Sequence, residues 1–355
     1  MAFGEESKIF KSESALSTEH LPEILPHREN QIKVLADNLD PAAHGRKPQN
    51  TFLFGAPGIG KTATTKFVFK QFEDTYPNVK TIYINCWDYK TIVSVLTKIG
   101  IDLQAFVQRR GVGKDEILER IIEVCKKSNK GIIICLDEVD QLIFNEPESL
   151  YDLLRINQYL SNPIGLVFIS NNPNVFFNLE PRIESSLDIE GIEFRAYSLM
   201  EMKDILHHRA TQAFISFENT AILLAASHAI TKGGDVRVGL EILMKAGRFA
   251  EESGSETVTV DCVKSILSTV KPVKPEILKE RVPYDEKIIL EILDQQKRKQ
   301  MFTGDLYKAY SEKIGDPVSE RRFRDFIDHL AQINLIQITE RKRGVKGKKR
   351  LVTKL

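Results

Sequence analysis

The first half of the chain alternates short apolar runs with longer amphipathic stretches. The short runs predict strands at residues 51–54, 80–85, 131–136 and 164–170. Helical patterns fill the gaps between them, for example at 61–73 and 114–127. Strands that alternate with helices are typical of a parallel sheet covered on both faces, so the pattern predicts an α/β unit.

After about Tyr197 the strand pattern stops. A capping box at Ser198 and Glu201 predicts a helix start, because the serine accepts an early backbone N–H and the glutamate reaches back. Further helical patterns follow at 218–231, 236–252 and 259–270. Two prolines, Pro272 and Pro275, cannot continue a helix and mark a domain boundary.

The C-terminal stretch has its own organisation. Helical patterns are found at 285–296, 303–314 and 319–333, and strand patterns at 335–339 and 350–355. Three helices followed by a two-stranded ribbon with a basic, glycine-bearing tip predict a winged helix-turn-helix. We therefore expect a flexible N-terminal tail over 1–20, an α/β base over 21–195, a helical lid over 196–272 and a winged-helix domain over 280–355.

The composition excludes several classes of protein. Hydrophobic residues make up 42% and charged residues 28% of the chain, which excludes a mainly disordered protein. The longest apolar runs, 132–136 and 164–169, are far too short to span a membrane, and the N-terminus shows no signal-peptide pattern. The four cysteines lie too far apart in sequence for zinc-ligand spacing. A reducing, intracellular location without a membrane partner is the expectation.

Residues 55–62 match the phosphate-loop pattern G-x-x-x-x-G-K-[ST] completely, between a predicted strand and a predicted helix. Glycines let backbone N–H groups turn toward phosphate oxygens, and the helix N-terminus adds a favourable dipole. Lys61 is expected to reach the β- and γ-phosphates of ATP, and the Thr62 hydroxyl to bind Mg²⁺. The predicted ATP/ADP-binding residues are Gly55, Pro57, Gly58, Ile59, Gly60, Lys61, Thr62 and Ala63. The alternative is a chance glycine-rich turn.

Two acidic residues end the apolar run at 132–136. Asp137 is expected to hold Mg²⁺, and Glu138 to orient and activate the attacking water as a general base. At the end of the next predicted strand, the Asn171 amide is expected to lie near the γ-phosphate. The alternatives are a solvated acidic turn and a turn asparagine before Pro173.

These motifs together resemble an AAA+ ATPase, and the flanking phrases narrow the resemblance to the archaeal origin-recognition and helicase-loader family. Residues 21–29 resemble its adenine-packing segment, 180–187 its segment of inter-subunit arginines, and 233–237 its lid motif. The resemblance implies that Leu25, Pro26 and Arg28 contact the nucleotide. It further implies that Arg237 contacts the γ-phosphate in cis and that Arg182 faces a neighbouring subunit. The alternatives are a surface arginine at a helix start and a salt bridge to Glu180 or Glu184.

The family also carries a helical insert after the second strand, and residues 87–113 are the place for it here. The resemblance makes Arg109 and Arg110 candidate DNA contacts. A solvated helix end is the other interpretation of this pair.

The overall net charge of +1 gives no reason to expect a nucleic-acid partner. The picture changes when the charge is counted separately for the C-terminal domain and for the rest of the chain. Residues 280–355 hold 18 basic and 12 acidic residues, a net +6, whereas the remainder holds 32 basic and 37 acidic residues, a net −5. Clustered positive charge is typical of proteins that bind the phosphate backbone of DNA. The predicted DNA-binding residues are Arg321, Arg322 and Arg324 in the third helix and Arg343, Lys346, Lys348 and Lys349 in the wing. Because Asp325 and Asp328 lie beside the helix arginines, we expect few base contacts and much of the affinity from the wing.

The favoured function is an ATP-dependent DNA-replication initiator, with slow hydrolysis resetting a switch. The implied partners are double-stranded origin DNA, the replicative minichromosome-maintenance helicase, and paralogous or identical subunits. The expected location is the cytoplasm, at the nucleoid. A clamp-loader-type motor and a nucleotide-gated transcription regulator are the alternatives.

Overall fold

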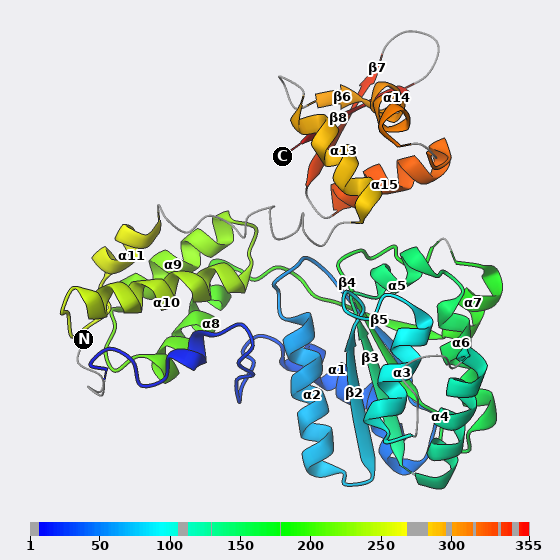
Figure 1. Cartoon of the computed structure of the whole chain (residues 1–355). Coiled ribbons are helices and arrows are strands. Elements are labelled where there is room, and N and C mark those ends of the chain that lie inside the picture. Colours follow the sequence, from blue (N-terminus) through cyan, green and yellow to red (C-terminus); the bar gives the residue numbers. More distant parts are fainter. Residues whose placement is uncertain are drawn as a thin grey trace. The chain divides into compact units, whose positions relative to one another are not determined.

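The computed structural model describes residues 7–105, 113–128, 130–177, 179–267, 283–295, 300–314, 317–332, 335–342 and 348–354. The chain forms two compact units, Met1–Val270 and Lys271–Leu355. In the residues just given, the first unit contains a sheet flanked by helices and a further group of helices, and the second contains three helices and a small sheet (Figure 1). Within the described residues, no helix is both long enough and apolar enough to cross a membrane.

A five-stranded parallel sheet forms the base, in the order β2-β3-β4-β1-β5. Its strands are β1 (Asn50–Phe54), β2 (Val79–Asn85), β3 (Gly131–Asp137), β4 (Gly165–Ser170) and β5 (Ile189–Glu193). The pairing of Phe54 with Ser170, and of Asp137 with Ile169, brings the carboxyl ends of three central strands to one edge. The strand β5 carries no apolar run, since only Ile192 is buried, and it was not predicted.

Successive side chains of β3 enter two different cores. Ile133 and Cys135 belong to a core shared with α1 and α2, whereas Ile132, Ile134 and Leu136 belong to one on the opposite face. Helices therefore cover both faces of the sheet, as predicted (Figure 1). The base helices are α1 (Glu29–Leu39), α2 (Lys61–Thr75), α3 (Ile92–Asp102), α4 (Lys114–Ser128), α5 (Val139–Asn145), α6 (Ser149–Ile156) and α7 (Pro181–Leu187).

Four described helices form the lid: α8 (Leu199–Ala213), α9 (Asn219–Thr231), α10 (Val236–Glu252) and α11 (Val260–Leu267). The predicted capping box is present, because Ser198 Oγ accepts from the Glu201 N–H and Glu201 accepts from the Ser198 N–H at 2.7 Å. Apolar faces of these helices pack into one continuous core with the α1–α2 face of the sheet.

Residues 7–20 differ from the flexible tail expected over 1–20. The Lys11 N–H donates to the Ala213 carbonyl at 2.8 Å, and the Ile215 N–H donates to the Ile9 carbonyl at 2.9 Å. Ile9 and the Ala15–Leu16 pair of the short helix η1 (Glu13–Leu16) are buried. The polar composition concealed this packing, because few apolar side chains and a short backbone pairing suffice to dock the segment. Residues 1–6 lie outside the described part.

The second unit has the element order α13 (Tyr284–Asp294), β6 (Gln300–Phe302), α14 (Thr303–Lys313), α15 (Glu320–Gln332), β7 (Ile336–Lys342) and β8 (Lys348–Lys354). The strands form an antiparallel sheet in the order β6-β8-β7, so three helices and a ribbon occur as expected of a winged helix. Helix α15 buries Phe323, Phe326, Ile327 and Leu330, the predicted core face. The three-residue strand β6 was too short to predict.

Candidate nucleotide site and nucleic-acid interface

The candidate phosphate loop joins β1 to α2 and turns on glycines with positive φ. Gly55, Gly58 and Gly60 have φ angles of 144°, 72° and 96°, which side chains rarely allow. A Cβ on Gly55 would lie only 2.2 Å from the Phe194 carbonyl oxygen. Glycine is therefore required for both backbone angle and space, and the resulting loop resembles the backbone nests that bind anions.

Lys61, the first residue of α2, binds the loop it follows. Its ammonium donates to the carbonyl oxygens of Gly55 and Ala56, both at 2.7 Å, and to Asn171 Oδ1 at 2.8 Å. Burial lowers the pKa of Lys61 to about 8, although the nearby acids Asp137 and Glu138 act in the opposite direction. The phosphate loop and the end of β4 thus meet at one ammonium group, and the contact of Asn171 with a γ-phosphate stays a prediction.

The Asp137 carboxylate ends β3 and accepts from three donors. Thr62 Oγ1 and the Tyr83 hydroxyl both donate to Oδ2 at 2.6 Å, and the Glu138 N–H donates to Oδ1 at 2.9 Å. Burial, followed by the Asp137 charge, raises the pKa of Tyr83, so its hydroxyl remains a donor. The carboxylate is thereby fixed in orientation next to the Thr62 hydroxyl.

The Thr62 hydroxyl and the Asp137 carboxylate offer a metal ion only two kinds of oxygen ligand, so the ion that fits is one that needs few ligands from the protein. Among the described residues no cluster of three or more His, Cys, Asp or Glu could form an all-protein cage. Mg²⁺ commonly takes one or two protein oxygens, with waters and substrate phosphates completing its octahedron. Thr62 and Asp137 therefore fit a Mg²⁺ ion that arrives with a nucleotide.

Glu138 follows Asp137 with a φ angle of 54° and precedes helix α5. A positive φ is uncommon for a residue with a side chain and occurs preferentially at functional sites.

On the neighbouring strand, Ser170 Oγ donates to Asp140 Oδ1 at 2.8 Å. Asp140 thus joins the start of α5, which follows β3, to the end of β4.

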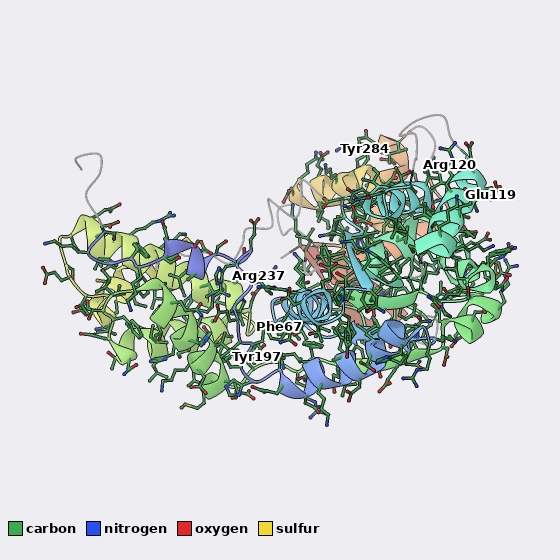
Figure 2. The ribbon with its side chains drawn as sticks, turned by 90° about the horizontal axis from the view of Figure 1, so that it is seen from below. Phe67, Glu119, Arg120, Tyr197, Arg237 and Tyr284 are labelled. Carbon is green, nitrogen blue, oxygen red and sulfur yellow. The ribbon has the colours of Figure 1, made fainter. Side chains whose placement is uncertain are left out.

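A cavity of about 390 Å³ lies between the phosphate loop and the lid. Its lining includes the predicted residues Pro57, Gly58, Gly60, Lys61, Thr62, Ala63, Asp137, Glu138, Asn171 and Arg237. The predicted base contacts Leu25 and Pro26 also line it, together with Leu21, Tyr197 and Ile205. One end is therefore polar and charged. The other, here called the apolar end, carries apolar side chains from residues 21–26 and the lid beside Glu19, His20, His208 and Arg209, and the combination suits a nucleotide. Tyr197 and Arg237 are labelled in Figure 2 where lid and base meet.

Arg28 was expected at this cavity, but it lies behind the phosphate loop. Its Nη2 donates to the carbonyl oxygens of Ile59 at 2.8 Å and Arg195 at 3.0 Å, and its guanidinium lies 3.9 Å from the Tyr197 ring centroid. Arg28 is not among the cavity-lining residues, and neither are Gly55 and the fully buried Ile59. These three residues shape the loop from outside the cavity.

Arg237 reaches the cavity from the start of α10, where it forms a bidentate pair with Asp235. Its Nε lies 2.9 Å from Asp235 Oδ1 and its Nη2 2.6 Å from Oδ2, and this pairing raises the pKa of Arg237. Asp235 is also packed against the phosphate loop, since a Cβ on Gly58 would lie 2.0 Å from its Oδ1. The Val236 N–H donates to the Gly58 carbonyl at 3.1 Å. The lid thus docks directly on the loop.

Arg182 lies in α7, away from the cavity lining. Its Nε contacts Glu180 Oε2 at 2.6 Å, and its guanidinium lies 5.2 Å from the Tyr151 ring centroid. The salt bridge that sequence analysis held as the alternative is present, and the side chain is 58% exposed, so the guanidinium is also accessible from solvent.

The candidate DNA-binding residues are placed unevenly. Arg321, Arg322 and Arg324 are exposed on α15, and Arg324 pairs with Glu320 at 3.0 Å. Asp328, expected to repel phosphates, is paired with Arg350 of β8. Lys348 and Lys349 begin β8, whereas Arg343, Lys346, Arg109 and Arg110 lie outside the described residues.

Comparison with known proteins decides the family. The family described as Cdc6 AAA+ ATPase-type lid domain matches residues 203–266, and the AAA domain family matches residues 44–173. An ORC1-type DNA replication protein 1 from Sulfurisphaera tokodaii is 33% identical over 354 residues, covering 96% of the chain and 89% of that protein. The chain belongs to the ORC1-type DNA replication protein family.

Other ORC1-type relatives match the chain over a similar share of its length. A second protein of that name, from Methanothermobacter thermautotrophicus, is 34% identical and covers 98% of the chain and 93% of its own length. Among solved structures, Aeropyrum pernix ORC1 in complex with DNA superposes with a TM-score of 0.77 at 30% identity, over 99% of this chain and 94% of that one. The family resemblance read from the sequence is confirmed, and so is its fold of AAA+ base and helical lid.

Most residues at the apolar end of the ORC1-type cavity were not predicted. Ile205, His208 and Arg209 of α8, and Leu240 of α10, line it from the lid. Ile205 and Leu240 are indistinguishable in sequence from ordinary helix core residues, so the hydrophobic pattern carried no signal for them.

The lowered pKa of Lys61 predicts that nucleotide binding is coupled to proton uptake. In the nucleotide-free site the ammonium loses its proton near pH 8, whereas a bound phosphate favours the charged form and raises this pKa. Affinity for ADP should therefore fall as pH rises above about 8. Calorimetric titration at pH 8.5 in two buffers of different ionisation enthalpy should show fractional proton uptake. Lys61→Arg, which keeps its charge, is the control, and equal heats in both buffers for the wild type would contradict the coupling.

Proposed function

We propose that this ORC1-type protein is an ATP-dependent replication initiator that binds duplex DNA at replication origins and helps to recruit the replicative helicase. The observation that carries the proposal is one cavity lined by a phosphate loop, two strand-end acids and a lid arginine. Because base and lid both line that cavity, a nucleotide bound there stabilises one arrangement of the two. The names of the relatives, and the DNA complex of the Aeropyrum pernix protein, support the DNA-binding part.

The site residues divide the work of ATP hydrolysis. The Thr62 hydroxyl and the Asp137 carboxylate would hold Mg²⁺, which would supply positive charge to offset that of the nucleotide phosphates. Lys61 binds phosphate oxygens. Its ammonium gives up its hydrogen bonds to the backbone carbonyls of Gly55 and Ala56, because a charged phosphate is a stronger acceptor. Glu138 accepts a proton from the attacking water. Asn171, held by Lys61, orients either that water or the γ-phosphate.

Arg237 makes the lid responsive to the γ-phosphate. Without a nucleotide its guanidinium is satisfied by Asp235, and an ATP γ-phosphate offers a second anion of the same bidentate geometry. The contact is lost when the γ-phosphate leaves, so ATP and ADP favour different lid positions. We infer that hydrolysis is slow and serves to reset this switch.

The second unit supplies the DNA contacts in this proposal. Helix α15 presents Arg321 and Arg324 away from its buried side and Arg322 near the edge of that side, all three exposed, as suits a recognition helix. The pair between Asp328 and Arg350 neutralises one of the acids that would repel phosphates. The basic ribbon tip, with Arg343, Lys346, Lys348 and Lys349, and the insert arginines 109 and 110 remain proposed phosphate contacts.

Removing the three α15 charges should weaken DNA binding and reduce its dependence on salt. Each phosphate contact adds about 0.9 to the slope of log affinity against log salt concentration, so a triple alanine substitution at 321, 322 and 324 should lower that slope by up to about 2.7. Fluorescence anisotropy with a labelled origin duplex, repeated at several salt concentrations, measures both quantities. A control variant, Lys264→Ala, changes an exposed lid lysine. An unchanged slope in the triple variant would exclude this face of α15.

Origin protection distinguishes the proposal from its alternatives. Footprinting on genomic DNA with ATP should show protection at replication origins. Protection confined to promoters would favour the nucleotide-gated transcription regulator, and sequence-independent binding would favour the clamp-loader-type motor.

The proposal also includes recruitment of the minichromosome-maintenance helicase. It places the protein in the cytoplasm, at the nucleoid. Pull-down of the purified helicase by the origin-bound protein, with ATP and with ADP, tests it directly. Arg182 is the proposed contact to a paralogous or identical subunit, because its exposed guanidinium can bind a neighbour's phosphate. Mixing Arg182→Ala with Glu138→Gln subunits should show whether it acts in trans.

A further inference from the structure

Residues 15–28, here called the strap, run from the lid to the phosphate loop. An arginine anchors each end, Arg209 of α8 on the lid side and Arg28 on the loop side. Figure 1 shows the segment passing along the lid beside α8 before it enters α1. Between the two anchors, strap residues line the apolar end of the cavity.

The lid anchor, Arg209, is a buried arginine that binds three backbone carbonyls. Its guanidinium donates to the carbonyl oxygens of Ala15 at 2.5 Å, Ser17 at 2.6 Å and His20 at 3.2 Å. Arg209 is 7% exposed, and burial lowers its pKa to about 10. One side chain therefore fixes the path of six consecutive residues, because a rigid, fork-shaped donor with three acceptors allows little displacement of any of them.

The second half of this stretch lines the cavity with Thr18, Glu19 and His20, and the strap continues along the cavity wall over residues 21–26. From α8, Ile205 and His208 line the same cavity. Arg209 itself also lies at the wall. The phosphate loop lines the cavity from the base, and the three hydrogen bonds of Arg209 all go to backbone carbonyls of the strap instead.

We propose that Arg209 is a positioning residue for the nucleotide base, which acts by holding the strap against the lid. The proposal rests on the nucleotide site described above. It makes base binding and lid position interdependent, since the base contacts a wall that is attached to the lid at one end and to the phosphate loop at the other. Loss of the anchor should loosen the base end and leave the phosphate end intact.

This division gives Arg209 a signature that a general structural role would not produce. In Arg209→Met, affinity for ADP and for ATP should each fall at least tenfold, with their ratio unchanged, because the γ-phosphate contact of Arg237 is preserved. Affinity for inorganic pyrophosphate, which has no base, should stay within about twofold. Arg209→Lys should be nearly as weak as Arg209→Met for ADP, because an ammonium cannot span three carbonyls in fork geometry.

The experiment is calorimetry or competitive displacement with ADP, ATP and pyrophosphate on the full chain. The matched control is Arg248→Met, which removes an exposed contact to Glu13 near the same segment and should leave all three affinities unchanged. Equal weakening of ADP and pyrophosphate in both Arg209 variants, or no weakening of ADP, would overturn the inference. A wild-type protein that binds neither ADP nor pyrophosphate would instead overturn the proposed nucleotide site.

Discussion

Replacing Lys61 by alanine is expected to reduce nucleotide affinity by at least about a hundredfold, which corresponds to about 2.7 kcal/mol. The substitution removes the ammonium that joins Gly55, Ala56 and Asn171, and leaves those three acceptors without their common donor. It also removes the positive charge closest to the phosphate loop from a buried place, where charge–charge attraction is strong. Calorimetry with ADP and with ATP measures the loss directly.

The control for this prediction lies on the same helix. Lys70 of α2 is exposed, so Lys70→Ala tests the loss of one positive charge from α2 without disturbing the loop. Wild-type affinity in Lys61→Ala would contradict the assignment of residues 55–62 as the phosphate loop. A comparable loss in Lys70→Ala would indicate a general electrostatic effect.

Glu138→Gln is expected to bind ATP normally and to lose hydrolysis by about 10²- to 10⁴-fold, the usual contribution of a general base. Glutamine has nearly the same shape, but it is uncharged and cannot accept the proton of the attacking water. The backbone contact that matters for the site is retained, because the residue-138 N–H still donates to Asp137 Oδ1. Phosphate release under single-turnover conditions, with ATP affinity measured in parallel, separates the two effects.

Glu148→Gln is the matched control, since it changes an exposed glutamate ten residues further along the chain that does not line the cavity. Turnover near the wild-type rate in Glu138→Gln would refute its role as base. Loss of ATP affinity would show instead that Glu138 supports the binding of nucleotide or metal, and that its positive φ serves the shape of the site.

The polar end of the nucleotide site could be predicted because its parts are local. The phosphate loop, the acids after β3 and Asn171 after β4 each follow a buried strand directly, and parallel strands bring their carboxyl ends to one edge. The AAA+ resemblance followed from these motifs, and the segments over 21–29, 180–187 and 233–237 narrowed it to the family. Short-range sequence pattern and a general topological rule were thus sufficient to place these residues at one edge of the sheet, and their chemical roles stay predictions.

The apolar end could not be predicted, because its residues are assembled by tertiary contacts. Ile205 and Leu240 look like ordinary helix core residues, and the segment over 7–20 looks like a polar tail. Arg28 shows the converse error, since a residue in a nucleotide-contacting phrase binds the back of the loop instead. Such distinctions depend on which face of a segment meets the lid, and sequence periodicity does not contain that information.

The close approach of Asp235 to Gly58 has a consequence for the evolution of the phosphate loop. Glycine is required at 58 for its backbone angle, and the lid independently needs the same space for a carboxylate. Residue 58 must therefore lack a side chain for two reasons: the positive φ of the loop and the space that Asp235 of the lid occupies. A change elsewhere that let the loop turn differently would remove only the first reason, and a side chain at 58 would still push the lid away from the loop. Substitution at position 58 is therefore restricted more strongly than its backbone conformation alone would require.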